Sequence, residues 1–158
     1  MVTSVSRANV VALASPASLM AGALGSQYLP EFFGGVGLHP CEMCHWQRWP
    51  HYAAIAIALV AFMAKPPMRN VLVALAAFAV LTSGVIGVFH AGVEYHWWAG
   101  PPCSASGAGM TLDEIMRAPL IRCDAAQWTL FGVSLAGYNA LFSFVGGITI
   151  LAHVRKAK

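Results

Sequence analysis

Apolar residues along the chain fall into four long blocks separated by short polar or turn-rich segments. The blocks cover residues about 8–29, about 46–64, about 70–91 and about 129–153. A helix that spans a bilayer needs roughly 20 mostly apolar residues, and each block meets or approaches that length. The second block is the shortest, and Arg48 and Lys65 near its ends are long cations that can reach the two membrane interfaces. The pattern predicts an all-α membrane protein, a four-transmembrane-helix bundle in which residues 1–158 form a single domain.

Two of the three connections are predicted to lie on the outer side of the membrane, as loops of residues about 30–45 and about 92–127. The second outer loop contains the segment TLDEIMRA, in which Thr111 and Glu114 have the spacing of a helix capping box. Its apolar positions recur at one helical face. We therefore expect a short surface helix there, lying on the membrane or packed on the top of the bundle.

Composition supports a membrane protein, since 58% of the residues are hydrophobic and only 9% are charged. About a quarter of the residues of a typical soluble domain are charged, so a soluble domain with buried helices is the weaker interpretation. The net charge of +3 does not indicate a nucleic-acid partner, because the basic residues form no patch interleaved with aromatic residues.

The positions of the charged residues predict the orientation. Six Lys and Arg residues lie in the two termini and in the connection between the second and third blocks: Arg7, Lys65, Arg69, Arg155, Lys156 and Lys158. All six acidic residues lie in or beside the other two connections. The positive-inside rule then places both termini in the cytoplasm and both outer loops on the far side. The first block resembles a secretory signal peptide in part, but it is longer than such a segment, so we expect it to remain as a helix.

All four cysteines, Cys41, Cys44, Cys103 and Cys123, lie in the two outer loops, where disulfides persist. Cys41 and Cys44 are three residues apart, so a helical turn beginning at Pro40 brings their sulfur atoms to one side. A helix N-terminus stabilises a thiolate. Arg48, one turn after Cys44, adds a positive charge on the same face. These features predict a redox-active thiol pair at the membrane interface.

Other uses of these cysteines are also open at this point. A CxxC pair alone is compatible with a static disulfide, and four cysteines are compatible with a zinc site. An oxidising compartment and the nearby arginine disfavour zinc, and we expect no metal. The segment from Cys41 to His45 also matches the C-x-x-C-H signature for covalent haem attachment, with Met110 as a possible second iron ligand. The haem interpretation leaves Cys103 and Cys123 unexplained.

Three segments together resemble the disulfide bond formation protein B (DsbB) family of membrane thiol:quinone oxidoreductases. They are CEMCHWQRWP, HAGVEYHWWAGPPC and PLIRCDAAQWTLFGVSLAGYN. The resemblance implies an enzyme of the bacterial inner membrane with its cysteine loops in the periplasm. It implies a soluble DsbA-like partner, a thioredoxin-fold dithiol oxidase, and a membrane quinone (ubiquinone or menaquinone) as the electron acceptor.

The resemblance also implies roles for individual residues. The partner would attack a Cys103–Cys123 disulfide, with Cys103 forming the mixed disulfide, and electrons would pass on to a Cys41–Cys44 disulfide. Cys44 would be the thiolate in contact with the quinone. Arg48 would stabilise that thiolate, and His90 would lie beside the quinone ring.

Two alternatives come from other classes of protein. An enzyme of the vitamin K epoxide reductase type also uses a CxxC pair in a helical bundle, but its CxxC commonly lies late in the chain. A structural membrane subunit with two static disulfides would need no quinone.

Overall fold

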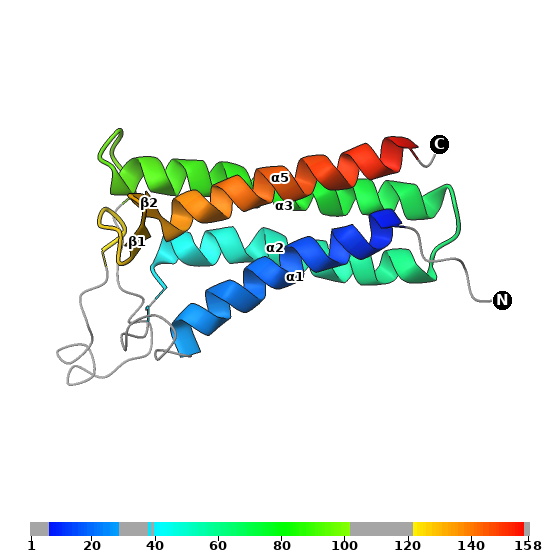
Figure 1. Ribbon diagram of the computed structural model, residues 1–158, viewed down its shortest axis with the longest axis horizontal. Helices are drawn as coiled ribbons and strands as arrows, with labels where there is room; N and C mark the ends of the chain where they lie inside the picture. Colours follow the sequence, from blue (N-terminus) through cyan, green and yellow to red (C-terminus); the bar gives the residue numbers. More distant parts are fainter. Residues whose placement is uncertain (1–6, 29–37, 39, 102–121, 157–158) are drawn as a thin grey trace.

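The computed structural model describes residues 7–28, 38, 40–101 and 122–156, and in this part of the chain four long helices run side by side (Figure 1). The helices are α1 (Arg7–Tyr28), α2 (Glu42–Met63), α3 (Met68–Glu94) and α5 (Leu135–Lys156), and a short hairpin consists of β1 (Thr129–Leu130) and β2 (Val133–Ser134). The first residue of α1 and the last residue of α5 lie at one end of the bundle, and the hairpin lies at the other (Figure 1). We call these the inner end and the outer end.

The first three helices follow the apolar blocks of the sequence closely, with one useful difference. The second helix begins at Glu42, earlier than the predicted position of about 46. Cys41 is its N-cap residue, so Cys44 lies within the first turn. The CxxC segment is therefore part of α2 rather than of the loop that precedes it.

The predicted start of the fourth helix, at about residue 129, is wrong. Residues 129–134 form an antiparallel hairpin in which Thr129 pairs with Ser134 and Leu130 pairs with Val133. The two turn residues, Phe131 and Gly132, have φ angles of 50° and 76°, as a two-residue type I′ turn requires. A right-handed helix cannot include two such residues, so α5 begins only at Leu135.

Side-chain hydrogen bonds fix the hairpin to the helices on both sides. The Tyr95 hydroxyl, just after α3, donates to the Gly132 carbonyl at 2.8 Å and accepts the Ser134 N–H at 2.8 Å. The Ser134 hydroxyl then accepts the Gly137 N–H at 3.2 Å and caps the first turn of α5. The outer ends of α3 and α5 are thereby held together.

Three helices of the described chain are long and apolar enough to cross a membrane, namely α1 over Arg7–Gly25, α3 and α5. The helix α2 falls short of that apolar character because its outer half contains Gln47, Arg48 and His51. Its outward-facing large residues are nevertheless apolar or aromatic, among them Trp49, Tyr52, Leu59, Val60 and Met63. The surface helix predicted near Thr111 lies outside the described residues.

Small residues allow the helices to approach closely. Ala54, Ala58 and Ala61 of α2 are fully buried in one core cluster with Ala76 and Ala77 of α3. Nearer the outer end, a Cβ atom on Gly87 of α3 would come within 3.0 Å of the Ala136 carbonyl oxygen of α5. Such contacts between small residues are typical of helix packing in membranes.

Candidate redox-active site

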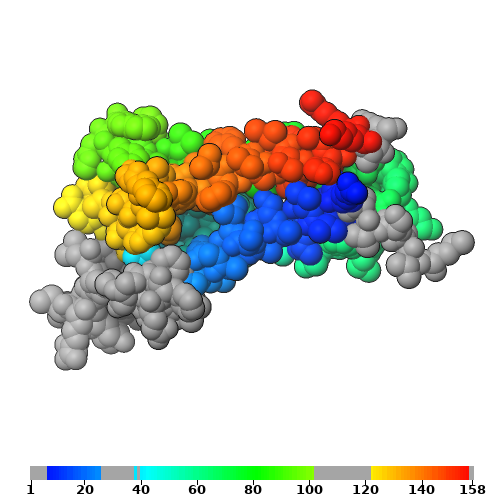
Figure 2. All heavy atoms as spheres, in the orientation of Figure 1, coloured from blue at the N-terminus to red at the C-terminus, as the bar shows by residue number. Residues whose placement is uncertain are grey.

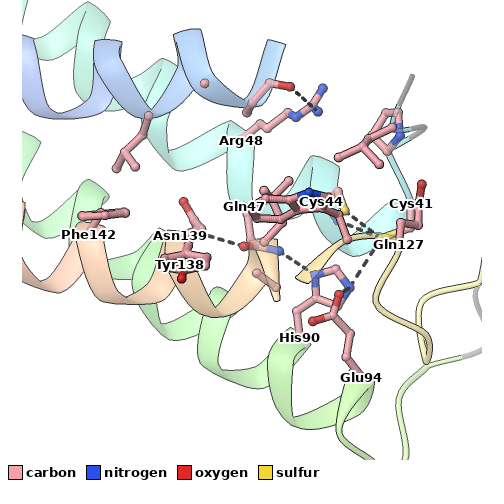
Figure 3. A pocket seen from close by; sticks show the side chains of 18 of the residues that line it. Cys41, Cys44, Gln47, Arg48, His90, Glu94, Gln127, Tyr138, Asn139 and Phe142 are labelled. Atoms are coloured by element: carbon pink, nitrogen blue, oxygen red, sulfur yellow. Dashed lines mark hydrogen bonds and ion pairs between the residues drawn. The ribbon is translucent and has the colours of Figure 1, made fainter. Parts of the chain in front are cut away.

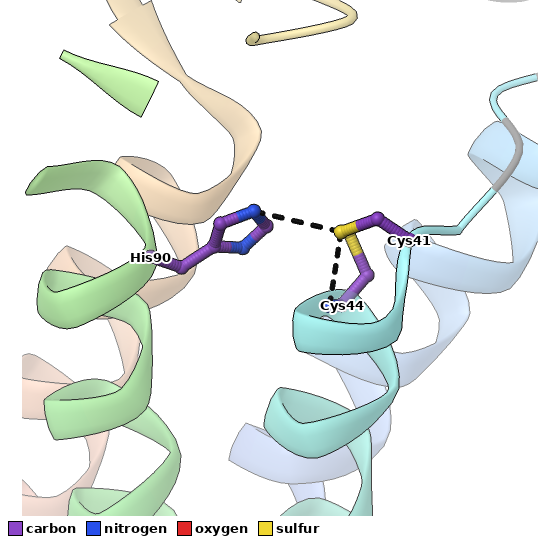
Figure 4. A group of neighbouring side chains, drawn as sticks. All are labelled: Cys41, Cys44 and His90. Carbon is purple, nitrogen blue, oxygen red and sulfur yellow. Dashed lines mark hydrogen bonds between the residues drawn. The ribbon is translucent and has the colours of Figure 1, made fainter. Parts of the chain in front are cut away.

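The two thiols of the CxxC segment lie together at the outer end of α2 (Figure 4). Their sulfur atoms are 3.0 Å apart and both cysteines are free, so the structure shows the reduced, dithiol form. The Cys41 sulfur also accepts the backbone N–H of Cys44 at 3.3 Å. The N-cap position of Cys41 therefore aims its sulfur at the free N–H groups of the first helical turn.

His90 reaches the same sulfur from α3 (Figure 4). Its Nε2 atom lies 3.5 Å from the Cys41 sulfur and 3.7 Å from a carboxylate oxygen of Glu94. Its Nδ1 atom lies 2.7 Å from the Gln47 amide nitrogen, which donates to it. Because Nδ1 accepts a hydrogen bond, the proton of a neutral His90 is on Nε2 and points toward Cys41.

These contacts favour the thiolate form of Cys41. The pKa of the Cys41 thiol is lowered to about 4, because a hydrogen bond with Cys44 and the contact with His90 stabilise the thiolate more than burial destabilises it. With Cys41 as the thiolate, Cys44 keeps its proton and donates to it. The sequence predicts a stabilised thiolate at Cys44, beside Arg48, and that role stays a prediction. In the dithiol form, His90 contacts Cys41.

Arg48 lies between α2 and α1. Its Nη2 atom donates to the Ala23 carbonyl of α1 at 3.4 Å. Its positive charge favours a negative charge on Cys44, and both residues line one cavity. The predicted neighbourhood of Arg48 and Cys44 is thus present, although the arginine is anchored to the backbone of α1.

The cavity, of about 480 Å³, lies between α1, α2 and α5 near the outer end of the bundle. Figure 2 shows that α2 is recessed between α1 and α5 toward this end. Tyr138 and Phe142 of α5 stack with their ring centroids 6.1 Å apart and contribute an aromatic wall, and Leu19 and Met20 of α1 contribute an apolar one. Cys44 and Arg48 lie on its wall (Figure 3). Its size and mainly apolar lining are typical of a site for a small, largely apolar molecule.

A network of polar side chains, absent from the sequence-based prediction, extends from the thiol pair into the bundle. The Asn139 amide of α5 donates to the Gln47 side-chain oxygen at 2.8 Å, and Gln47 in turn donates to His90 (Figure 3). Ser83 of α3 and His51 of α2 continue the network away from the thiols. Buried polar groups within membrane helices are costly and usually functional. The spacing of Cys44, Gln47 and His51 along one face of α2 was the signal in the sequence.

Cys123, from the second outer loop, lies close to the thiol pair. It is disulfide-bonded and buried, and it belongs to one apolar cluster with Cys41, Met43 and Val93. The other cysteine of the second loop, Cys103, lies outside the described residues. The structure therefore brings Cys41, Cys44, His90 and Cys123 together at the outer end of the bundle.

The thiol pair and His90 also have the spacing of metal ligands. The two sulfurs and a ring nitrogen of His90 all lie within 4.8 Å of one another. Thiolate and imidazole ligands suit zinc, so distances alone permit a metal site as well as a redox-active dithiol. The predicted absence of a metal stays a prediction.

Comparison with known proteins shows the family of the chain. Residues 6–153 match the family model described as "Disulfide bond formation protein DsbB". The chain belongs to the DsbB family. It is therefore a multi-pass membrane oxidoreductase that acts on disulfides, and the match includes both cysteine-bearing segments, α1 to α3 and most of α5.

Individual members of the DsbB family are similar over most of their length. Disulfide bond formation protein B of Verminephrobacter eiseniae (strain EF01-2) is 33% identical over 129 residues, which cover 74% of this chain and 71% of that protein. Disulfide bond formation protein B of Polaromonas sp. (strain JS666 / ATCC BAA-500) is 32% identical over 117 residues, or 67% of this chain and 68% of that protein. No solved structure matches the chain.

Proposed function

We propose that this DsbB-family protein reoxidises a soluble DsbA-like dithiol oxidase and passes the electrons to a membrane quinone. The observation that carries the proposal is the cavity of about 480 Å³ that has Cys44 and Arg48 on its wall. A quinone headgroup is planar, carries no charge, and is attached to an apolar tail. Apolar walls from α1 and α5 suit such a ligand, and a cation beside it stabilises the negative charge that develops on its oxygens during reduction.

Electrons enter at the second outer loop in this proposal. The reduced partner attacks the Cys103–Cys123 disulfide, its thiolate forms a mixed disulfide with Cys103, and Cys123 leaves as a thiolate. The packing of Cys123 in one cluster with Cys41 supports exchange between the two loops, because thiol–disulfide exchange requires direct approach of the sulfur atoms. The partner leaves as a disulfide, and the two electrons pass to the Cys41–Cys44 disulfide, which becomes the dithiol.

The exit step moves two electrons from the thiol pair to the quinone and yields the Cys41–Cys44 disulfide and a quinol. Of the two protons that the quinol needs, the pair supplies one, from Cys44, and the aqueous phase supplies the other. When Cys41 is engaged in a disulfide with the second loop, it no longer accepts a proton from Cys44. Cys44 is then free to act as the thiolate that faces the cavity, with Arg48 stabilising it. Since the Nε2 proton of His90 points at Cys41, His90 supports Cys41 as a leaving thiolate. A contact of His90 with the quinone ring is compatible with its place on the cavity wall.

The same proposal includes the topology. We infer that α2 crosses the bilayer as the fourth span, because its polar residues Gln47 and His51 are buried against α3 and α5 while its outward-facing large residues are apolar or aromatic. Both termini then lie in the cytoplasm, and the thiol pair lies at the periplasmic face of the bacterial inner membrane. Neither the haem interpretation nor a vitamin K epoxide reductase-like activity gains support, and the His45 side chain is exposed.

Reconstituted turnover tests the function. The purified protein in detergent, a reduced thioredoxin-fold periplasmic oxidase and decylubiquinone are mixed, and the quinone absorbance and the thiols of the oxidase are followed together. We expect both to be consumed in equal amounts. Cys44→Ser should abolish quinone reduction, with a loss of at least about a thousandfold, since it removes a reacting atom. If Cys44→Ser still reduces the quinone, the assigned electron exit is wrong.

A further inference from the structure

Cys123 faces inward from a segment in which the neighbouring side chains face out. The Arg122 and Asp124 side chains are 63% and 43% exposed and form an ion pair at 2.7 Å, whereas Cys123 is 3% exposed. Cys123 packs with Cys41 and Val93 in one buried cluster. Apolar packing is not directional, so it does not by itself hold the backbone of Cys123 at one position beside Cys41. A hydrogen bond to that backbone is directional and does.

The ring of His90 makes such a hydrogen bond. Its Nε2 atom lies 3.5 Å from the Cys41 sulfur (Figure 4), and the backbone of Cys123 is hydrogen-bonded to the same ring. Nδ1 accepts the N–H of Gln47, so the one proton of the neutral ring is on Nε2. The Nε2–H group is therefore the donor, and the carbonyl oxygen of Cys123 is the acceptor. One N–H group thus contacts a cysteine from each outer loop.

The ring of His90 is held from its other side as well. The Gln47 amide nitrogen donates to Nδ1 at 2.7 Å and also lies 3.3 Å from the Met43 carbonyl, and the Gln47 side-chain oxygen accepts from Asn139 at 2.8 Å. His90 and Gln47 are 2% and 6% exposed. Turning the ring would break these buried hydrogen bonds without water to replace them. The Nε2–H group is therefore fixed in its direction toward the point where the two loops meet.

We infer that His90 is a positioning residue for exchange between the loops, because its Nε2–H holds the backbone of Cys123 and thereby keeps the Cys123 sulfur beside the Cys41 sulfur. The inference rests on the proposed function and deepens it. In the exchange step, the Cys123 thiolate attacks the Cys41 sulfur, the Cys41–Cys123 bond forms, the Cys41–Cys44 bond breaks, and Cys44 leaves as a thiolate. The step needs no external oxidant. Holding the two sulfur atoms together raises the effective concentration of one at the other, which favours the bond between them.

A Cys103→Ser parent protein separates this role from stabilisation of the Cys41 thiolate. Oxidised to one disulfide per molecule, it exchanges between a Cys41–Cys44 and a Cys41–Cys123 disulfide. Cys41 is oxidised in both isomers, so any effect of His90 on the Cys41 thiolate cancels from their ratio. The full-length protein is equilibrated in detergent at mildly alkaline pH, without quinone or oxygen, and quenched with acid. Peptide mapping then measures the ratio of the two isomers.

Two polar substitutions at His90 are compared in this parent. The amide of His90→Asn extends only as far as Nδ1 and cannot reach Cys123, so the ratio of Cys41–Cys123 to Cys41–Cys44 disulfide should fall about threefold to tenfold, as expected for the loss of one hydrogen bond. His90→Gln places an amide N–H near the position of Nε2 and should keep the ratio within about twofold of the parent. His45→Leu is the matched control, because His45 is exposed beside the thiol pair, and it should leave the ratio unchanged.

The outcomes separate the inference from the proposed function. An unchanged ratio in His90→Asn overturns the inference alone, as does an equal fall in His90→Asn and His90→Gln, which would assign the effect to the imidazole ring rather than to its N–H group. An equal fall in His45→Leu overturns it too. If the parent forms no Cys41–Cys123 disulfide, the two loops do not exchange, and the proposed route of the electrons fails together with the inference.

Discussion

The two halves of the bundle are made of the same helices but are packed in opposite ways. In the inner half, alanines of α2 and α3 bury one another completely, with Val80 and Ile150 filling the remaining space. In the outer half, the helices leave a cavity, and hydrogen-bonded polar side chains replace the alanines on the facing surfaces. Stability and chemistry are therefore separated along the bundle axis. The closely packed half holds the helices in place so that the outer half can keep an open, polar site.

The largest change is expected in stability, when a larger side chain is introduced into the inner half. Ala77→Leu puts extra carbon atoms into a fully buried position and should lower the free energy of unfolding by about 1–3 kcal/mol. The matched control is Ala56→Leu, because Ala56 is exposed on the outer surface of α2. Unfolding of the two variants in mixed micelles measures the difference. Equal stability of the two variants would contradict the close packing described for the inner half.

A second effect concerns the thiolate of the outer half. His90→Leu removes the N–H group that faces Cys41, so the pKa of Cys41 should rise from about 4 toward the ordinary value of 9.0, by at least about one unit. The thiolate, and with it alkylation of Cys41, would then appear only at higher pH. Site-resolved mass spectrometry of alkylation as a function of pH measures the midpoint. His45→Leu, at an exposed histidine beside the pair, should leave the midpoint unchanged. A midpoint in His90→Leu equal to that of the wild type would show that His90 does not stabilise the Cys41 thiolate.

The smallest change is expected when a larger side chain is introduced into the outer half, where it should alter quinone binding and leave stability unchanged. Gly22 lines the cavity, and a Cβ atom there would meet nothing within 4 Å, so Gly22→Leu should keep the stability of the wild type. Its side chain would occupy part of the cavity and raise the KM for decylubiquinone about threefold. Gly25→Leu is the control, because Gly25 is equally unobstructed but does not line the cavity. A larger effect of Gly25→Leu than of Gly22→Leu would place the quinone elsewhere.

The sequence alone predicted most of the helices but not the contacts between them. Apolar length predicted α1, α2 and α3 closely, because that signal is local. The start of α5 was missed because residues 129–134 are as apolar as a helix, and only the left-handed turn at Phe131 and Gly132 separates them from it. Local apolarity cannot distinguish a short hairpin from the first turns of a membrane helix.

Local sequence patterns also fail to predict the contacts between distant residues in the site. The cysteines and Arg48 were predicted from spacing and from the resemblance, but the contact between Cys41 and His90 joins residues 49 positions apart. Asn139 contacts Gln47 across 92 residues. Such pairs depend on how three helices pack, and a single sequence does not contain that information in any local pattern.

The central claim, that the Cys41–Cys44 pair passes its electrons to a quinone in the adjacent cavity, can be tested in a single turnover. A Cys103→Ser, Cys123→Ser variant is reduced, freed of reductant and mixed with decylubiquinone. We predict that one quinone is converted to quinol for each protein molecule, and that peptide mapping finds a new Cys41–Cys44 disulfide. An unchanged quinone absorbance, with Cys41 and Cys44 still reduced, would contradict it.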